Sequence, residues 1–434
     1  METKKKGFPV AFWVCSCSEI FERLAYYLGR SLILIFVTAS VATGGLGLSD
    51  TVAANMQSNL TAFSYLLPLF GAVIVDKYIG ARYTTPVGMF IAAAGYFTGG
   101  IAKSATGVYV MIFLVSLGLA LFKNGAIIGR VITDKSQMDP AFSMRYTLVN
   151  VGAFIGTFLV GILYKDVFAK DGVLGFAPCF KMAALMMVLG GLWYIFVCWR
   201  FLGDLGKLPF KKTLTEEEKA AEAKKKEEAG TKQPLTTIEK KRIGAIFVAS
   251  LFSIVFWIFW YLGYMPVYFY WAENMDWVVA GYQVPSTWFD AANSLFCVIL
   301  GPVTAALWKK LAARPQGDMS LFRKTGLGIA IIGVGYLFYA AIDIMRGGEK
   351  ASVLWLIVFA FLLTMGEMFF SPLGHSFISK YSPSRYLAVM MSVWGFATFI
   401  AAKSYGPVYG LLFGGKIEFK VACIGVAVVS FAAA

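Results

Sequence analysis

The sequence predicts an all-α polytopic membrane protein that is built from two six-helix bundles. Of its 434 residues, 58% are hydrophobic and only 15% are charged, whereas soluble domains carry about 25% charged residues. About a dozen segments reach the roughly 20 mainly apolar residues that a membrane-spanning helix needs. One long polar stretch divides these segments six and six, which predicts the two bundles.

The expected spans follow one another along the whole chain. They lie at 8–41, 50–76, 82–102, 106–132, 142–164, 176–202, 243–272, 286–310, 322–344, 351–379, 385–412 and 417–434. The first span is too long for the core of a signal peptide and lacks a small-residue cleavage site, so we expect it to be retained. The last span ends at Ala434 without a polar tail, and we expect it to be truncated there.

Basic residues are concentrated in every second loop. They include the run at 4–6, Lys77 with Arg82, the stretch 130–145, the stretch 309–324, and Lys380 with Arg385. The other loops are poor in Lys and Arg. Because basic loops stay inside the cell, we expect a multi-pass protein of the cell membrane with both termini in the cytoplasm. The net charge of +14 is then explained by these loops beside the lipid bilayer, and no nucleic-acid partner is expected.

The composition changes sharply at 203–242, where the segment from Thr213 to Lys232 is nearly all Glu, Lys and Ala. This stretch is too polar to span a membrane, so we expect a solvated cytoplasmic linker. The predicted domains are an N-terminal six-helix bundle at 1–202, the linker at 203–242, and a C-terminal six-helix bundle at 243–434.

The loop between the second and third spans carries a motif. Residues 71–82 read GAVIVDKYIGAR, which resembles the signature G-x(4)-D-[RK]-x-x-G-x-R of the major facilitator superfamily. Gly80 favours a tight cytoplasmic turn there, and Asp76 is able to pair with basic groups at helix ends. The resemblance implies the major facilitator fold, in which two six-helix halves are related by a pseudo-two-fold axis along the membrane normal.

One polar stripe runs along the first span. Its members are spaced as on one helix face and are Glu19, Glu22, Arg23, Tyr26, Tyr27 and Arg30. A membrane helix must turn such a stripe toward the bundle interior or a wet cavity, because charge in hydrocarbon is costly. We expect these charges to be functional; structural ion pairs between helices are the alternative.

Seven segments together resemble the proton-coupled oligopeptide transporter family. They are EIFERLAYY at 19–27, YLLP at 65–68, LFK at 121–123, SMRYTLVNVGA at 143–153, WFDAANSLF at 288–296, GEMFFSPLG at 366–374 and MMSVW at 390–394. The likeness runs along nearly the whole chain. It implies a symporter that moves di- and tripeptides into the cell by alternating access and acts as a monomer, with protons as the coupling ion and no cofactor.

The resemblance also implies how a peptide is held. A dipeptide is a zwitterion with variable side chains, so a tolerant site must hold its two charged ends. Arg30 and Lys123 are cations suited to the peptide carboxylate, and Glu367 is an anion suited to the amino terminus. The other implied substrate-binding residues are polar or aromatic: Tyr26, Tyr27, Tyr65, Asn150, Asn293, Ser371 and Trp394.

The implied proton-coupling residues are Glu19, Glu22, Arg23 and Lys123. A pair of carboxylates that gains and loses the Lys123 ammonium as the halves rock would change its proton affinity between states. The sequence contains no pattern that indicates a dedicated sodium site, although it leaves sodium coupling open.

Five positions depart from the family pattern. Tyr261 stands where many members carry an acid that pairs with the first-span arginine. Arg145 replaces an aromatic residue, and we expect it to snorkel toward the cytoplasmic surface. Lys403 lies deep in the eleventh span, where it compensates for the missing acid, binds an anion or forms a structural pair. Asp290 replaces a neutral residue. His375 is the fifth position, and we do not expect it to take part in proton transfer.

Other function classes are alternatives to peptide symport. Within transporters, the alternative substrate is nitrate or a small organic anion, because Lys403 and the missing acid make the protein more cationic. A receptor or scaffold is a further alternative, which flux measurements would exclude. An enzyme is not expected, because the sequence has no Ser/His/Asp arrangement, metal cluster or phosphate-binding glycine loop. The six Cys lie in or near apolar segments, where we expect small buried side chains rather than disulfides.

Overall fold

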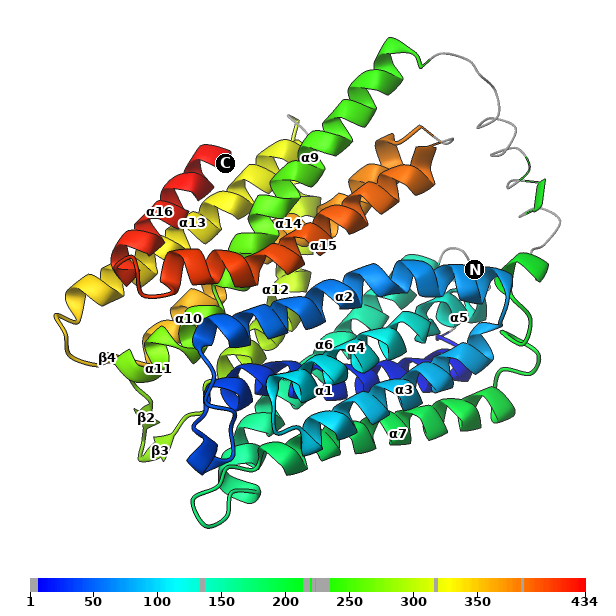
Figure 1. Ribbon diagram of the computed structural model, residues 1–434. Coiled ribbons are helices and arrows are strands. Elements are labelled where there is room, and N and C mark those ends of the chain that lie inside the picture. Colours follow the sequence, from blue (N-terminus) through cyan, green and yellow to red (C-terminus); the bar gives the residue numbers. More distant parts are fainter. Residues whose placement is uncertain are drawn as a thin grey trace. The chain divides into compact units, whose positions relative to one another are not determined.

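The structure is a computed structural model that describes residues 7–132, 137–213, 219–220, 223, 235–315, 319–383 and 386–434 (Figure 1). The described residues are largely helical, as the sequence predicted, and each expected span coincides with helix. The chain forms two compact units, Met1–Gly47 with Leu66–Leu214 and Leu48–Tyr65 with Thr215–Ala434. The predicted domain bounds at 202 and 243 stay a prediction.

The first unit contains the helices of the N-terminal half. They are α1 (Val10–Thr38), α2 (Asp50–Lys77, of which residues 66–77 belong here), α3 (Ala81–Ile101), α4 (Ala105–Leu121), α5 (Asn124–Val131), α6 (Met138–Ile162) and α7 (Phe176–Arg200). Short turns complete it: η1 (Val41–Thr43), η3 (Leu163–Val167) and η4 (Phe210–Lys212). Within this unit α1 packs on α6 and α7, and α3 packs on α4 and α7.

Small residues let these helices approach closely. A methyl group placed on Gly71 of α2 would collide with the backbone of Ala120 in α4, and one on Gly156 of α6 would meet the carbonyl of Leu24 in α1. In a membrane, where helices gain no hydrophobic driving force from one another, such close contacts supply much of the association energy.

The fourth predicted span, 106–132, is not one continuous helix. Helix α4 ends at Leu121, and α5 begins at Asn124. Between them, the backbone amide of Lys123 donates to Thr85 Oγ1 at 3.3 Å, which ties the break to α3. The break matters for the site, because it places Lys123 and Asn124 at the junction of two short helices.

The second unit contains the remaining elements. Its helices are α9 (Thr237–Leu262), α10 (Met265–Tyr268), α11 (Tyr270–Asn274), α12 (Trp288–Ala312), α13 (Leu321–Met345), α14 (Leu354–Tyr381), α15 (Leu387–Phe413) and α16 (Phe419–Ala433). Helix α9 begins with a capping box, in which Thr236 and Glu239 satisfy each other's backbone amides. Helix α13 packs on α14 and α16, α12 packs on α14, and α9 packs on α15.

Short strands connect helices of the second unit. Strands β2 (Val278–Val279) and β3 (Tyr282–Gln283) form an antiparallel hairpin whose turn residues, Ala280 and Gly281, both have positive φ, as a type I′ turn requires. Strand β1 (Met275–Asp276) pairs in parallel with β4 (Ala351–Ser352).

Residues 48–65, at the start of α2, belong to the second unit because they pack on α15. Ser58 Oγ donates to the carbonyls of Ala402 and Lys403 at 2.7 and 3.0 Å. A methyl group on Gly406 would press on the backbone of Ala54, so the two helices touch closely. The boundary between the units therefore lies inside α2 and not only in the predicted linker.

Seven helical stretches of the described chain are long and apolar enough by themselves to cross a membrane. They are Asp50–Lys77, Ala105–Val131, Pro140–Val167, Phe176–Arg200, Thr237–Asn274, Trp288–Leu311 and Phe322–Met345. Helix α1 is absent from this set because its middle carries Glu19, Glu22, Arg23 and Arg30. These lengths and compositions agree with a multi-pass membrane protein.

Candidate functional site

Several of the predicted site residues lie in two polar clusters, one in each unit. The cluster of the first unit is centred on α1, where Glu19 and Glu22 are only 2% and 0% exposed. Their spacing of three residues places both carboxylates on the buried face of the helix. Two acidic side chains are thus held inside a membrane helix bundle, where each needs a partner.

The partner of Glu19 is Arg145 from α6. Arg145 Nη2 lies 2.8 Å from Glu19 Oε1, and its Nε donates to the same oxygen at 2.9 Å. Asn124 Nδ2 adds a hydrogen bond to Oε1 at 3.2 Å and another to the carbonyl of Cys15 at 2.8 Å. The expectation that Arg145 snorkels to the surface was wrong, because the Glu19 carboxylate draws its guanidinium inward.

The partner of Glu22 is its neighbour Arg23. The guanidinium of Arg23 forms two hydrogen bonds with the Glu22 carboxylate. It also lies 4.9 Å from the ring centroid of Tyr26, which packs edge-on against Tyr27 at 5.3 Å. Four members of the predicted stripe, Glu22, Arg23, Tyr26 and Tyr27, therefore form one connected group of charges and aromatic rings.

Lys123 has a different partner from the predicted one. Its Nζ donates to the carbonyl of Pro68 in α2 at 2.8 Å, and Asp76 of the signature loop acts on it electrostatically. In this conformation the described cation that reaches Glu19 from another helix is therefore Arg145. The sequence did not predict the interruption between α4 and α5 at Lys123, because residues 106–132 form one continuous apolar segment.

Two other predicted residues of the first unit are Arg30 and Asn150. Arg30 is 5% exposed on α1. Asn150, on α6, donates to the carbonyl of Tyr146 in its own helix at 3.0 Å. Sequence reasoning missed Asn124, which is fully buried and touches Glu19. The one signal for it was a polar residue directly after Lys123 in an apolar segment.

The cluster of the second unit is centred on Glu367 of α14, which is 8% exposed. Asn293 Nδ2 donates to Glu367 Oε2 at 3.2 Å and to Thr364 Oγ1 at 2.8 Å. Cys297 Sγ lies 3.8 Å from the same carboxylate oxygen. These partners of Glu367 carry no formal charge, so they orient the carboxylate without neutralising it.

A hydrogen-bonded group of hydroxyls joins α2, α9 and α15 in the second unit. Tyr261 OH donates to Tyr65 OH at 3.2 Å, and the Tyr261 ring stacks on Tyr405 at 4.9 Å. Tyr405 in turn lies 3.2 Å from Thr61 Oγ1 and from Gln57 Oε1. Tyr261 is therefore built into a neutral network at the position where an acid was expected.

The remaining predicted residues of the second unit have separate surroundings. Trp394 is buried and stacks on Phe370, with ring centroids 6.1 Å apart. Lys403 donates to Asn59 Oδ1, so it forms a structural pair with a neutral group. Asp290 is buried and accepts a hydrogen bond from Tyr268. The side chains of Ser371 and His375 lie outside the described residues.

The cysteines and the acidic groups of the described chain show no metal centre. No group of three or more His, Cys, Asp and Glu side chains within the described ranges is arranged to hold a metal ion. All six cysteines are free thiols, and five of them are buried: Cys15, Cys179, Cys198, Cys297 and Cys423.

The chain is mostly helical, and each of its two units holds charged side chains among apolar helices. Buried charges of this kind are typical of membrane transporters. Residues 202–412 match the sequence profile of the POT family. Among solved structures, a POT family transporter in complex with 5-aminolevulinic acid superposes with a TM-score of 0.86 at 23% identity, covering 99% of this chain and 96% of that one. The fold is accordingly the major facilitator fold, as predicted.

Curated relatives extend the likeness over the rest of the chain. An uncharacterized transporter of Bacillus subtilis is 24% identical over 92% of this chain and 87% of its own. The peptide transporter YePEPT of Yersinia enterocolitica is 24% identical over 95% and 88%, and a di-/tripeptide transporter of Lactococcus lactis is 24% identical over 89% and 86%. The chain is thus similar to the POT family, whose sequence profile matches its residues 202–412, and the named relatives here are transporters and not enzymes.

Proposed function

We propose that this protein carries di- and tripeptides into the cell by alternating access and couples their uptake to the entry of protons. Two of its relatives are named as peptide transporters, which supports the substrate class. The observation that carries the coupling is the pair of buried α1 carboxylates, Glu19 and Glu22, each held by an arginine. Such a pair is able to take up and release protons inside a membrane helix bundle.

The two charged ends of the peptide are bound by opposite charges. Glu367 receives the peptide ammonium, since Asn293 and Cys297 orient its carboxylate but leave its charge available. Arg30 and Lys123 receive the peptide carboxylate. Asn150 and Asn293 add neutral hydrogen bonds to the peptide termini. Tyr26, Tyr27, Tyr65 and Trp394 surround the variable part of the peptide, and Ser371 is a further substrate-binding residue.

Proton coupling in this proposal works through exchange of ion-pair partners. While Glu19 is ionised it holds Arg145, and protonation of Glu19 removes the charge that keeps Arg145 on α1. Lys123 now rests on the Pro68 carbonyl, from which it is able to move to a peptide carboxylate. Glu22 with Arg23 forms the second proton-binding pair. The protein works as a monomer with both termini in the cytoplasm, and it uses protons as the coupling ion without a cofactor.

The test is uptake of labelled dialanine into proteoliposomes with and without an inward proton gradient. Accumulation that requires the gradient and collapses with a protonophore is the expected result. If dialanine only equilibrates across the membrane, with or without the proton gradient, the protein transports peptides but does not couple their uptake to protons. No uptake of dialanine by folded protein would contradict the substrate class itself.

A second candidate substrate is a small anion such as nitrate or a small organic acid. It is favoured by Tyr261, which sits in a neutral network, and by Lys403, whose described partner Asn59 is also neutral, so that the second unit keeps an extra positive charge. Competition separates the candidates. Excess unlabelled dialanine blocks the transport of a peptide carrier, whereas nitrate blocks that of an anion carrier.

A further inference from the structure

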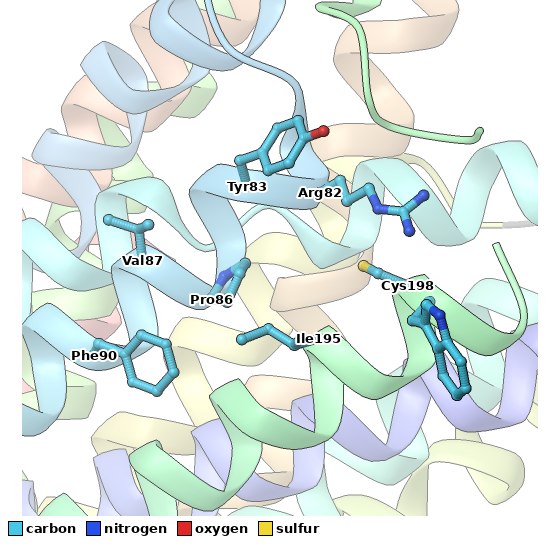
Figure 2. Close-up of a pocket in the computed structure, with 8 residues that line it drawn as sticks. Arg82, Tyr83, Pro86, Val87, Phe90, Ile195 and Cys198 are labelled. Atoms are coloured by element: carbon cyan, nitrogen blue, oxygen red, sulfur yellow. The ribbon is translucent and has the colours of Figure 1, made fainter. Parts of the chain in front are cut away.

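A groove lies between α3 and α7 of the first unit, outside the polar clusters described above. It encloses a volume of about 300 Å³, which is at the lower end of the range for ligand pockets. Residues from both helices line it, among them Arg82, Tyr83, Val87, Phe90, Ile195 and Trp199. Figure 2 shows Arg82 at one end of the groove, and Val87 with Phe90 toward the other.

The groove opens to the outside of the helix pair. Tyr83 and Val87 are 52% and 49% exposed and lie one turn apart on α3, while Ile195 and Trp199 are 45% and 75% exposed and one turn apart on α7. Outward apolar side chains on membrane helices face lipid tails. The middle and far end of the groove are thus suited to a hydrocarbon chain.

The end at Arg82 is positively charged. Arg82 donates one hydrogen bond to the carbonyl of Gly203, in the loop after α7, and a guanidinium has five N–H donors in all. The acid in this loop, Asp204, is bonded to Lys207 Nζ at 2.5 Å, so its charge is compensated. Arg200, directly after Trp199, adds a further positive charge to the same end of α7.

We propose that this groove binds an anionic phospholipid. Arg82 contacts the phosphate, Tyr83 and Trp199 lie at the level of the glycerol backbone, and one acyl chain runs along Val87, Phe90 and Ile195. Tyr and Trp side chains concentrate at this depth of a bilayer, and each Lys or Arg near an anionic membrane surface strengthens binding by about 1 kcal/mol.

A second copy of this chain is a poorer occupant of the groove. In a symmetric dimer the same patch meets itself, and the lining of this groove includes Arg82 but no acidic residue that could pair with the Arg82 of a second copy. An anionic lipid headgroup supplies the opposite charge instead. The charge at the end of the groove therefore selects the lipid.

The test is native mass spectrometry of the purified full chain, titrated with phosphatidylglycerol or phosphatidylcholine. We expect phosphatidylglycerol to bind more tightly, and Arg82→Gln to weaken its binding about fivefold, which corresponds to the loss of one cation at the surface. Arg82→Lys keeps the charge and is expected to keep the binding. Val87→Trp fills the groove and is expected to remove the bound lipid whatever its headgroup.

The control is Phe97→Trp, which enlarges another exposed residue of α3 beyond the groove and should leave lipid binding unchanged. Equal binding of the two lipids by the wild-type protein, or equal lipid occupancy in the Val87→Trp and Phe97→Trp variants, would overturn the proposal. So would displacement of the lipid by glycerol phosphate, which would indicate a site for soluble anions. A dimer that Val87→Trp dissociates would show that a second copy occupies the groove.

Discussion

Arg145 reaches from α6 to α1 and places its Nη2 atom 2.8 Å from Oε1 of Glu19. The glutamate side chain is 3% exposed and the arginine side chain 29%, so this ion pair lies at the edge of the buried core of the first unit. It links two long helices through a group that is able to bind a proton. The ion pair therefore contributes to the packing of α6 on α1.

Removal of one partner of this pair is expected to destabilise the protein. Arg145→Gln leaves a buried carboxylate with Asn124 as its remaining described partner and should lower the free energy of unfolding by about 2 kcal/mol. Glu19→Gln in the same chain should recover part of that loss, since both charges are then gone. Thermal unfolding of the two single variants and the double variant measures the coupling. Strictly additive effects would show that the pair contributes nothing.

Glu22→Gln is expected to abolish proton-driven accumulation of peptide but to keep peptide exchange across the membrane. The amide preserves the size of the buried side chain beside Arg23 and removes the titratable group. Counterflow and gradient-driven uptake in proteoliposomes measure the two activities separately. Glu418→Gln, at an exposed carboxylate that pairs with Lys420, is the matched control. Unimpaired uphill uptake by Glu22→Gln would remove Glu22 from the coupling role.

Lys123→Ala is expected to weaken both peptide binding and uphill transport. Loss of a charge-assisted hydrogen bond to the peptide carboxylate corresponds to about a tenfold increase in Kd. Binding of labelled dialanine and its accumulation in proteoliposomes give the two readouts. Lys103→Ala, at an exposed position between α3 and α4, should behave as the wild type. Wild-type affinity in Lys123→Ala would exclude Lys123 as a carboxylate ligand.

Glu367→Gln is expected to weaken dialanine binding about tenfold without unfolding the protein. The amide oxygen still accepts from Asn293, so the local hydrogen bond survives while the negative charge is lost. N-acetyl-dialanine lacks the ammonium group and should bind the wild-type protein more weakly than dialanine does. We expect it to bind the wild type and Glu367→Gln with equal affinity. If the variant discriminates between the two compounds as strongly as the wild type does, the ammonium is bound elsewhere.

Gly71→Ala is expected to lower the thermal stability, because its methyl group would collide with the backbone of Ala120 in α4. Overpacking of this kind costs about 1–3 kcal/mol. Gly425→Ala is the matched control, since Gly425 lies within α16 with no atom close to the position of a new methyl group. That variant should be as stable as the wild type or slightly more so. Equal unfolding temperatures for the two variants would contradict the close packing of α2 on α4.

Local sequence information was sufficient for the helices and the family. Each membrane helix had a long apolar run, and the polar stripe on the first span had a helical spacing that correctly predicted buried carboxylates. The order of the motifs along the chain predicted the POT family. These properties depend on residues that are neighbours along the chain, so the sequence alone determined them.

The partners of the charged side chains were decided by the tertiary structure. The sequence predicted that the first-span carboxylates gain and lose Lys123 between states. In this conformation Lys123 donates to the carbonyl of Pro68, and Arg145 pairs with Glu19. Which side chain reaches a buried charge depends on the rotation of each helix about its axis and on the point at which a helix is interrupted. Both are set by contacts such as that of Gly71 with Ala120, between residues far apart in the sequence. The sequence alone therefore determined that the two carboxylates of the first span are buried, and only the packed structure determined which cations pair with them.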